Sequence, residues 1–157
     1  MPRGQREDEP QRILILTDGR EDLGVHTASM LMAHGWRAHV TRSRTEALEQ
    51  TRKAARSGLF DMILVELAGP APEWSLLGEL KAISPGTAVG ALLHRDQMRL
   101  AQKVLAVPNV TCVVGHDDPE ELWKRVASTL AWERLRHCDN AICKSLQDKL
   151  PGGISIV

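Results

Sequence analysis

Cysteine is scarce in this sequence. Cys112, Cys138 and Cys143 are odd in number, and no two of them have the C-x-x-C spacing. They predict neither a disulfide framework nor a zinc site, and they fit a reducing cytoplasm. Long apolar runs are also missing, since no stretch approaches the roughly 20 apolar residues of a membrane span. The N-terminus is charged and has no apolar centre like that of a signal peptide, so we expect a disordered lead-in over 1–11.

An excess of charge of either sign is lacking as well. Lys and Arg number 20, Asp and Glu number 20, and the formal net charge is +0. This balance gives no argument for a nucleic-acid or membrane surface. Glycine-rich phosphate loops are absent, and the scattered histidines have no Ser or Cys partner for a catalytic triad. The sequence therefore predicts that the protein is not an enzyme and holds no cofactor.

One cluster of metal-ligand residue types does occur. Cys112 is followed by His116, Asp117 and Asp118. These residues span an expected turn from a strand to a helix, and Asp118 is already explained as the N-cap before Pro119 at the first helical position. We therefore predict no metal site here.

An unbroken apolar run is the feature around which the chain is organised. Residues 62–65 are Met-Ile-Leu-Val, followed by Glu66 and then by Gly69 and Pro70. Four apolar residues without polar alternation are typical of a parallel strand covered on both faces. Ligands of open α/β sheets gather at the carboxyl ends of such strands, so Glu66 stands where a functional residue is expected.

Strands and helices alternate along the rest of the chain. The expected strands are 13–16, 37–40, 62–65, 87–93 and 110–114. The expected helices are 23–34, 45–56, 74–83, 96–107 and one that starts at about Pro119. Five β-α units with short connections predict one domain with a parallel sheet and right-handed crossovers.

Three features together carry a family resemblance. Asp18 follows the first strand, the stretch 60–70 reads Phe-Asp-Met-Ile-Leu-Val-Glu-Leu-Ala-Gly-Pro, and 117–122 reads Asp-Asp-Pro-Glu-Glu-Leu. The chain from about 12 to 131 thereby resembles the receiver domain of bacterial response regulators. The resemblance implies a flavodoxin-like, doubly wound, five-stranded parallel α/β sheet with strand order 2-1-3-4-5, here with an extended C-terminal helix.

Receiver phosphotransfer uses an Asp nucleophile, acids that hold magnesium, a hydroxyl, a switch aromatic and a lysine. By resemblance, the nucleophile position falls on Glu66, the acidic pair on Thr17 and Asp18, the hydroxyl on Leu93, the switch aromatic on Cys112 and the lysine on Gly115. Most of these roles are therefore vacant, and the chain contains no Tyr at all. Asp18 and Glu66 alone also offer few oxygens for the octahedral coordination that Mg²⁺ prefers.

We therefore expect a phosphorylation-independent pseudo-receiver. A Glu side chain is longer than that of Asp, so an oxygen of Glu66 would lie roughly where a phosphoryl oxygen on Asp lies, and it could mimic the activated state. In the simpler interpretation, Glu66 is a solvated acid with no switching role. Two other functions stay open: an atypical but functional phospho-receiver of a two-component system, and a stand-alone protein-interaction adaptor.

An apolar stripe recurs along the C-terminal part of the chain. Its members, the candidate contacts of a homodimer, are Leu122, Val126, Leu130, Leu135, Ile142 and Leu146. A long helix with an uncovered stripe usually finds a partner helix, often from a second copy. The alternative is that the stripe folds back on its own sheet. We thus divide the chain into a receiver-like domain over 12–132 and a helical linker and dimerisation extension over 133–150.

The last residues carry a weaker resemblance. The sequence Pro-Gly-Gly-Ile-Ser-Ile-Val over 151–157 reads as the start of a following segment. It is similar to the turn that leads into the AAA+ ATPase of sigma-54-dependent transcription activators, some of which carry receiver-like domains without phosphorylation residues. The resemblance implies the regulatory domain of a bacterial transcription regulator, with a downstream AAA+ domain of the same polypeptide as a further partner.

Overall fold

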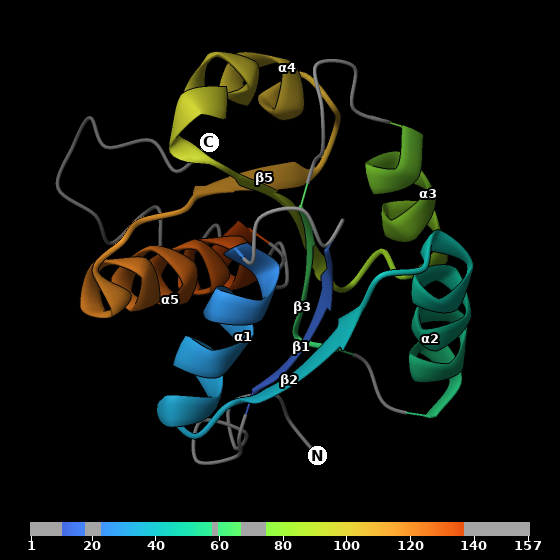
Figure 1. The fold of residues 1–157 in the computed structure, drawn as a ribbon. Coiled ribbons are helices and arrows are strands. Elements are labelled where there is room, and N and C mark those ends of the chain that lie inside the picture. Colours follow the sequence, from blue (N-terminus) through green and yellow to red (C-terminus); the bar gives the residue numbers. More distant parts are fainter. Residues whose placement is uncertain (1–10, 18–22, 58–59, 67–74, 137–157) are drawn as a thin grey trace, which may run out of the picture.

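The architecture is a parallel sheet enclosed by helices (Figure 1). The computed structural model describes residues 11–17, 23–57, 60–66 and 75–136. The strands are β1 (Arg12–Leu16), β2 (Arg37–Thr41), β3 (Met62–Glu66), β4 (Ala88–Leu93) and β5 (Val110–Val114). They lie in the order β2-β1-β3-β4-β5, and all neighbours pair in parallel. The prediction of a flavodoxin-like, doubly wound α/β fold is confirmed.

Helices cover both faces of this sheet. They are α1 (Leu23–Ala33), α2 (Arg44–Ser57), α3 (Ser75–Ile83), the 3₁₀ segment η2 (Arg95–Leu100), α4 (Ala101–Leu105) and α5 (Pro119–Arg136). Side chains of α1 and α5 pack on one face, and those of α2, α3 and α4 pack on the other. No helix in the described ranges is long and apolar enough to cross a membrane.

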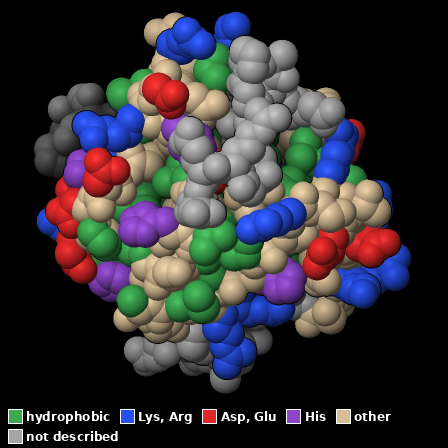
Figure 2. Space-filling view, viewed as in Figure 1, with side chains coloured by type: hydrophobic (Ala, Val, Ile, Leu, Met, Phe, Trp, Pro, Cys, Tyr) green, Lys and Arg blue, Asp and Glu red, His purple; other side chains and the backbone are tan. Residues whose placement is uncertain are grey.

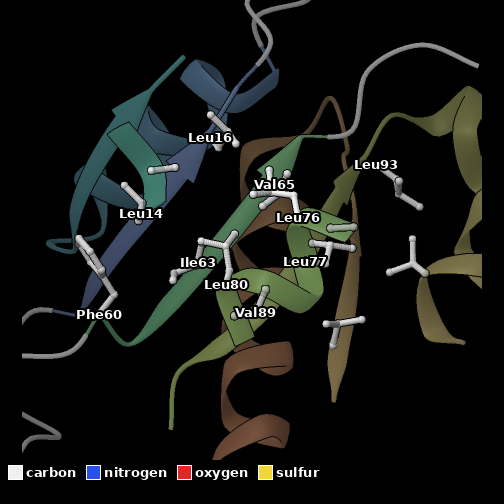
Figure 3. Close-up of a cluster of buried hydrophobic side chains, with 14 of the residues drawn as sticks. Leu14, Leu16, Phe60, Ile63, Val65, Leu76, Leu77, Leu80, Val89 and Leu93 are labelled. Atoms are coloured by element: carbon white, nitrogen blue, oxygen red, sulfur yellow. The ribbon is translucent and has the colours of Figure 1, made fainter. Parts of the chain in front are cut away.

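The strands alternate between the two cores. Ile63 and Val65 pack with α2 and α3 (Figure 3), whereas Met62 and Leu64 pack with α1 and α5. Because both faces are covered, every residue of β3 is buried, including Glu66. This two-sided burial is the physical reason for the unbroken apolar run in the sequence.

The fourth helix differs from its prediction. Instead of one helix over 96–107, the chain forms η2 and then the short α4. The Gln97 side chain accepts a hydrogen bond from the His94 backbone N–H, and the Gln97 N–H donates to the His94 carbonyl. This i→i+3 arrangement starts the segment as a tighter 3₁₀ turn.

Three of the six predicted dimer contacts belong to the domain's own core, which corrects the expectation for these three. Leu122, Val126 and Leu130 are buried against the sheet together with residues of α1. Their side chains are therefore not available to a partner. Sequence periodicity reports that a helix face is apolar, but it does not report which surface covers that face.

The exposed apolar surface of α5 begins further along the helix. Leu135 is 40% exposed and Trp132 is 48% exposed, while Glu133 between them is buried. The predicted contacts Ile142 and Leu146 lie outside the described residues, as do 151–157. At the other end of the chain, Gln11 is buried and its carbonyl accepts the Arg37 N–H, so the ordered domain includes the last residue of the expected lead-in.

Candidate functional site

The predicted site positions gather at one edge of the sheet. β1, β3, β4 and β5 are parallel, so their carboxyl ends meet there. Thr17, Glu66, Leu93 and Gly115 lie at or directly after these strand ends. Asp18, the predicted second member of the acidic pair, lies outside the described residues.

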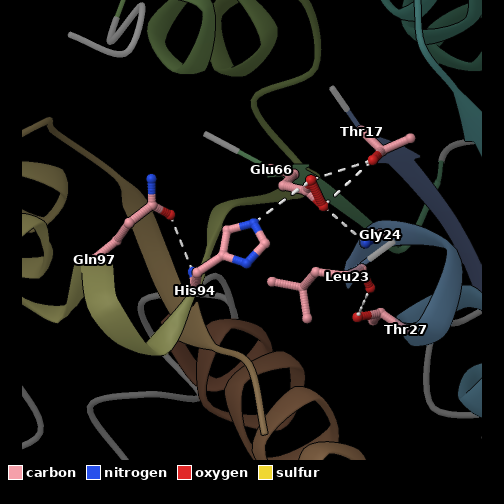
Figure 4. Close-up of polar contacts among 7 residues, drawn as sticks. All are labelled: Thr17, Leu23, Gly24, Thr27, Glu66, His94 and Gln97. Atoms are coloured by element: carbon pink, nitrogen blue, oxygen red, sulfur yellow. Dashed lines mark hydrogen bonds and ion pairs between the residues drawn. The ribbon is translucent and has the colours of Figure 1, made fainter. Parts of the chain in front are cut away.

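Glu66 is buried and hydrogen-bonded at this edge (Figure 4). Its Oε1 accepts the backbone N–H of Gly24 at 2.8 Å, and the Thr17 hydroxyl lies 3.3 Å from both carboxylate oxygens. The interpretation of Glu66 as a solvated strand-end acid is therefore wrong. The carboxylate is turned toward β1 and the first turn of α1.

The start of α1 favours a negative charge at this point. Gly24 is the second residue of the helix, where backbone N–H groups have no intrahelical acceptor and the helix dipole is positive. A Cβ at position 24 would lie 2.7 Å from the Cβ of Thr17, so only glycine allows this close approach. The sequence did not reveal this contact because 42 residues separate Gly24 from Glu66.

His94 is a site residue that the sequence analysis missed. Its Nε2 lies 3.7 Å from Oε2 of Glu66 (Figure 4), with 17% of the histidine side chain exposed and none of the glutamate side chain. His94 directly follows the last residue of β4. That place, immediately after a strand of a parallel sheet, was the available sequence signal.

The other predicted positions do not join Glu66. Leu93 is fully buried in the core cluster on the side of α2, α3 and α4, and Cys112 packs against the same cluster. Burial raises the pKa of the Cys112 thiol to about 11, because desolvation disfavours the thiolate. At Gly115, a Cβ would lie 2.7 Å from Cδ1 of Leu23, so Leu23 fills the space beside this backbone.

Magnesium, which the resemblance to receivers implies, does not fit the described residues. The Glu66 oxygens already face the Gly24 N–H, the Thr17 hydroxyl and the His94 ring. Within the described ranges, no group of three His, Cys, Asp or Glu side chains is arranged to hold a metal ion. Mg²⁺ requires several oxygen ligands in octahedral geometry, whereas the described residues around Glu66 offer hydrogen-bond donors and an imidazole.

A hollow of about 610 Å³ opens beside His94 and Leu23. Its lining residues are Leu23, His26, His94, Arg95, Asp96, Gly115, His116 and Asp117. Acidic and basic side chains are interspersed over the described part of the face in Figure 2, with several histidines among them. Acidic, basic and apolar residues therefore line the hollow together with the imidazoles of His26, His94 and His116.

Comparison with known proteins finds matches among solved structures. No protein-family model and no curated protein sequence matches the chain. A putative response regulator from Chloroflexus aurantiacus is similar in structure, with 19% identity, a TM-score of 0.64, and coverage of 78% of this chain and 99% of its own. A CheY-like receiver domain protein from Methanospirillum hungatei has 18% identity, a TM-score of 0.61, and coverage of 81% and 98%.

A further similar structure covers more of this chain. An adenylate cyclase from Rhodopirellula baltica has 16% identity and a TM-score of 0.63, and the match covers 90% of this chain and 99% of that one. At these low sequence identities, the similarity in structure shows the fold alone. The strand order, the helices on both faces and these matches together show that the chain has the fold of response-regulator receiver domains.

Proposed function

We propose that this domain is a phosphorylation-independent pseudo-receiver that regulates a bacterial transcription regulator in the cytoplasm. The observation that carries the proposal is the state of Glu66, which is buried, hydrogen-bonded to Gly24 and Thr17, and 3.7 Å from His94. The Glu66 side chain is longer than the Asp that receivers carry at this position, so its carboxylate oxygens can take the place of the oxygens that a receiver acquires by phosphorylation.

The neighbouring positions support this proposal. Phosphoryl transfer depends on groups that neutralise the charge of the transferred oxygens. Leu93 provides no hydroxyl and packs into the core, while Gly115 provides no side chain and lies against Leu23. A carboxylate already accepting the Gly24 N–H is also less available as a nucleophile.

Incubation of the chain with acetyl phosphate and Mg²⁺, followed by intact-mass measurement, tests the proposal. We expect no added phosphoryl group, with a receiver that accepts acetyl phosphate treated in parallel as the control. An acid-labile phosphate that disappears in Glu66→Gln would contradict it and would identify an atypical phospho-receiver.

We further propose that the domain dimerises through the outer face of α5 and its extension. Trp132 and Leu135 are exposed apolar side chains on this helix. The sequence continues with Cys138, Ile142 and Leu146, at a spacing typical of a helix that pairs with a second copy. Leaving such side chains in water costs roughly 1.5–3 kcal/mol each relative to burial.

Light scattering at several concentrations tests the interface. Leu135→Lys should shift the chain toward monomer, because it puts a charge into the proposed contact. Leu105→Lys on α4 is a matched control, since Leu105 is also a large exposed apolar side chain, with 61% exposure. Dissociation by Leu105→Lys alone would place the contact on the α4 side and contradict the proposal.

The output partner that we propose is a downstream AAA+ ATPase of the same polypeptide, as in sigma-54-dependent activators. The similarity of residues 146–157 to the linker of those activators supports this proposal. Measuring ATP hydrolysis by the full-length regulator with and without residues 1–136 tests it. Equal activity in both forms would indicate that the domain is instead a protein-interaction adaptor.

A further inference from the structure

A second hollow, of about 600 Å³, lies at the outer edge of the sheet. β5 is the last strand in the sheet order, so within the described ranges its outer edge pairs with no further strand. α4 lies to one side of β5 and α5 to the other (Figure 1), and residues of η2, β5 and α5 line the hollow. Its volume is in the range of about 300–1,000 Å³ that is typical of small-molecule sites.

Part of the lining is apolar. Cys112 and Val113 of β5 contribute to it, and so does Met98 of η2, which is 61% exposed. The pKa of the Cys112 thiol is raised to about 11, so this side chain is uncharged at neutral pH. The hollow therefore offers a surface on which a ligand can bury an apolar part.

The charged part of the lining is mainly basic. Lys124 and Arg125 of α5 and Arg95 of η2 line the hollow, and Glu121 is the one carboxylate among its described lining residues. The chain as a whole has a formal net charge of +0, so this positive excess is local. Arg95 and Asp117 lie 3.5 Å apart, but their side chains are 64% and 95% exposed, so solvent screens the pair and Arg95 can still face a ligand.

Arg125 is held in place beside the strand. Its Nη1 donates to the Val114 carbonyl at 3.0 Å, and its Nε lies 3.6 Å from Oε1 of Glu121. The Gly115 N–H of the same peptide group donates to Leu93 of β4, so the Val114 carbonyl points to the outer edge. A guanidinium has five N–H donors, and these two contacts leave others for a ligand.

Capping of the strand edge accounts for Arg125 but not for its neighbours. An arginine over an exposed strand edge protects that edge from pairing with another chain. Lys124 makes no ion pair within the described ranges, and Ser128 lies one helical turn further along the same side of α5. A lysine, a guanidinium and a hydroxyl thus line the same hollow, and all three can donate hydrogen bonds to an anion.

We propose that this hollow binds a small organic carboxylate with an apolar body. The carboxylate lies against Lys124, Arg125 and the Ser128 hydroxyl, and the body covers Cys112 and Val113. A planar guanidinium matches the geometry of a carboxylate. A phosphate monoester carries nearly two negative charges at neutral pH and is less suited, because Glu121 also lines the hollow.

An extended peptide is the less favoured occupant. Strand addition at the β5 edge would use the backbone groups of that edge, and Arg125 already occupies the Val114 carbonyl. The proposal goes beyond the proposed function and does not depend on it, since Glu66 is not among the lining residues. Phosphate uptake at Glu66 would therefore leave carboxylate binding, measured without Mg²⁺ or a phosphodonor, unchanged.

Titration of the full chain with naphthoate, followed by two-dimensional NMR of the backbone amides, tests the site. We expect saturable shifts at Cys112, Val113, Lys124 and Ser128. Naphthamide has the same body without the charge, and acetate has the charge without the body, so both should bind more weakly. Equally tight binding of naphthamide would exclude a role for the cations, and equally tight binding of acetate would indicate an adventitious anion only; either result would overturn the proposal.

Three variants locate the carboxylate. Lys124→Gln should weaken naphthoate binding about two- to fivefold, as for the loss of an exposed ion pair. Ser128→Glu should weaken it further, because it places a negative charge beside the ligand's own. Both positions are exposed on α5, so the fold should tolerate the changes. Lys103→Gln on α4 is the matched control, since Lys103 is also exposed but does not line the hollow.

Three results would contradict the assignment. They are the absence of saturable shifts in the wild type, unchanged affinity in both Lys124→Gln and Ser128→Glu, and equal weakening by Lys103→Gln. Titration with a Glu-rich peptide is the last arm. Shifts of the same amides with this peptide but not with naphthoate would assign the surface to a protein partner and overturn the proposal.

Discussion

Leu23 lies against the backbone of Gly115, so that a Cβ at position 115 would come within 2.7 Å of its Cδ1. By resemblance, position 115 is where a receiver carries its phosphate-binding lysine. Leu23 belongs to the first turn of α1, the same turn that presents the Gly24 N–H to Glu66. The first turn of α1 thus holds the buried carboxylate through Gly24 and, through Leu23, occupies the space beside Gly115.

This relationship predicts that phosphorylation is not restored by putting back two of the missing groups. The double variant Glu66→Asp, Gly115→Lys should remain unphosphorylated by acetyl phosphate and Mg²⁺, as judged by intact mass. Leu23 must shift to admit the new lysine, and Leu93 still provides no hydroxyl. Stoichiometric phosphate uptake by the double variant would show that the site is only two substitutions from activity.

Gly24→Ala should destabilise the fold, because the added Cβ meets Thr17 at 2.7 Å. We expect a loss of about 1–3 kcal/mol in the free energy of unfolding by urea, as for other overpacked sites. Gly78→Ala on α3 is the matched control, since its Cβ would meet nothing within 4 Å. This control should stabilise the chain by up to about 1 kcal/mol, because Ala is the better helix former. Equal effects of the two substitutions would contradict the close approach.

Two leucines of α5 should respond in different ways to the same substitution. Leu122→Ala should lower the free energy of unfolding by about 2–5 kcal/mol, because Leu122 is fully buried between α5 and the sheet. Leu135→Ala should change the stability of the monomer by less than about 0.5 kcal/mol. Urea unfolding at low protein concentration measures both. A large loss for Leu135→Ala would mean that this side chain is part of the core.

Cys112 should react slowly with iodoacetamide in the native protein up to about pH 10. Its pKa is raised to about 11, so the reactive thiolate is rare below that pH. The same shift makes a contribution to stability that is complete below the ordinary thiol pKa, about 9, and is lost as the pH rises through about 11. Site-resolved mass spectrometry separates Cys112 from the other two cysteines. Fast labelling of Cys112 at pH 8 would contradict the raised pKa of its half-buried thiol.

The sequence predicted the elements of this fold better than their contacts. The run 62–65 and the alternation of units were sufficient for the sheet, because two-sided burial demands continuous apolar strands. Leu122, Val126 and Leu130 were assigned to a partner because periodicity does not identify the covering surface. The start of η2 depends on the side chain of Gln97 capping His94, a local competition that helical spacing does not reveal.

For the candidate site too, the position was predictable from the sequence and the contacts were not. Its place was predictable, because the carboxyl ends of parallel strands meet at one edge of the sheet. The burial and hydrogen bonding of Glu66 were not predictable, because its partners Gly24 and Thr17 are 42 and 49 residues away in the sequence. His94 was missed for a similar reason, since its partner Glu66 lies on another strand.

The most direct test of the central claim is titration of the wild-type chain with beryllofluoride and Mg²⁺, a phosphoryl mimic that requires no catalysis, followed by two-dimensional NMR of the backbone amides. If the longer Glu66 side chain already occupies the place of a phosphoryl group, the amides of Gly24, His94 and Gly115 will not shift at any concentration of the mimic. Saturable shifts at these amides that vanish in Glu66→Gln would show that the site binds a phosphoryl group, and would contradict the account of a phosphorylation-independent pseudo-receiver.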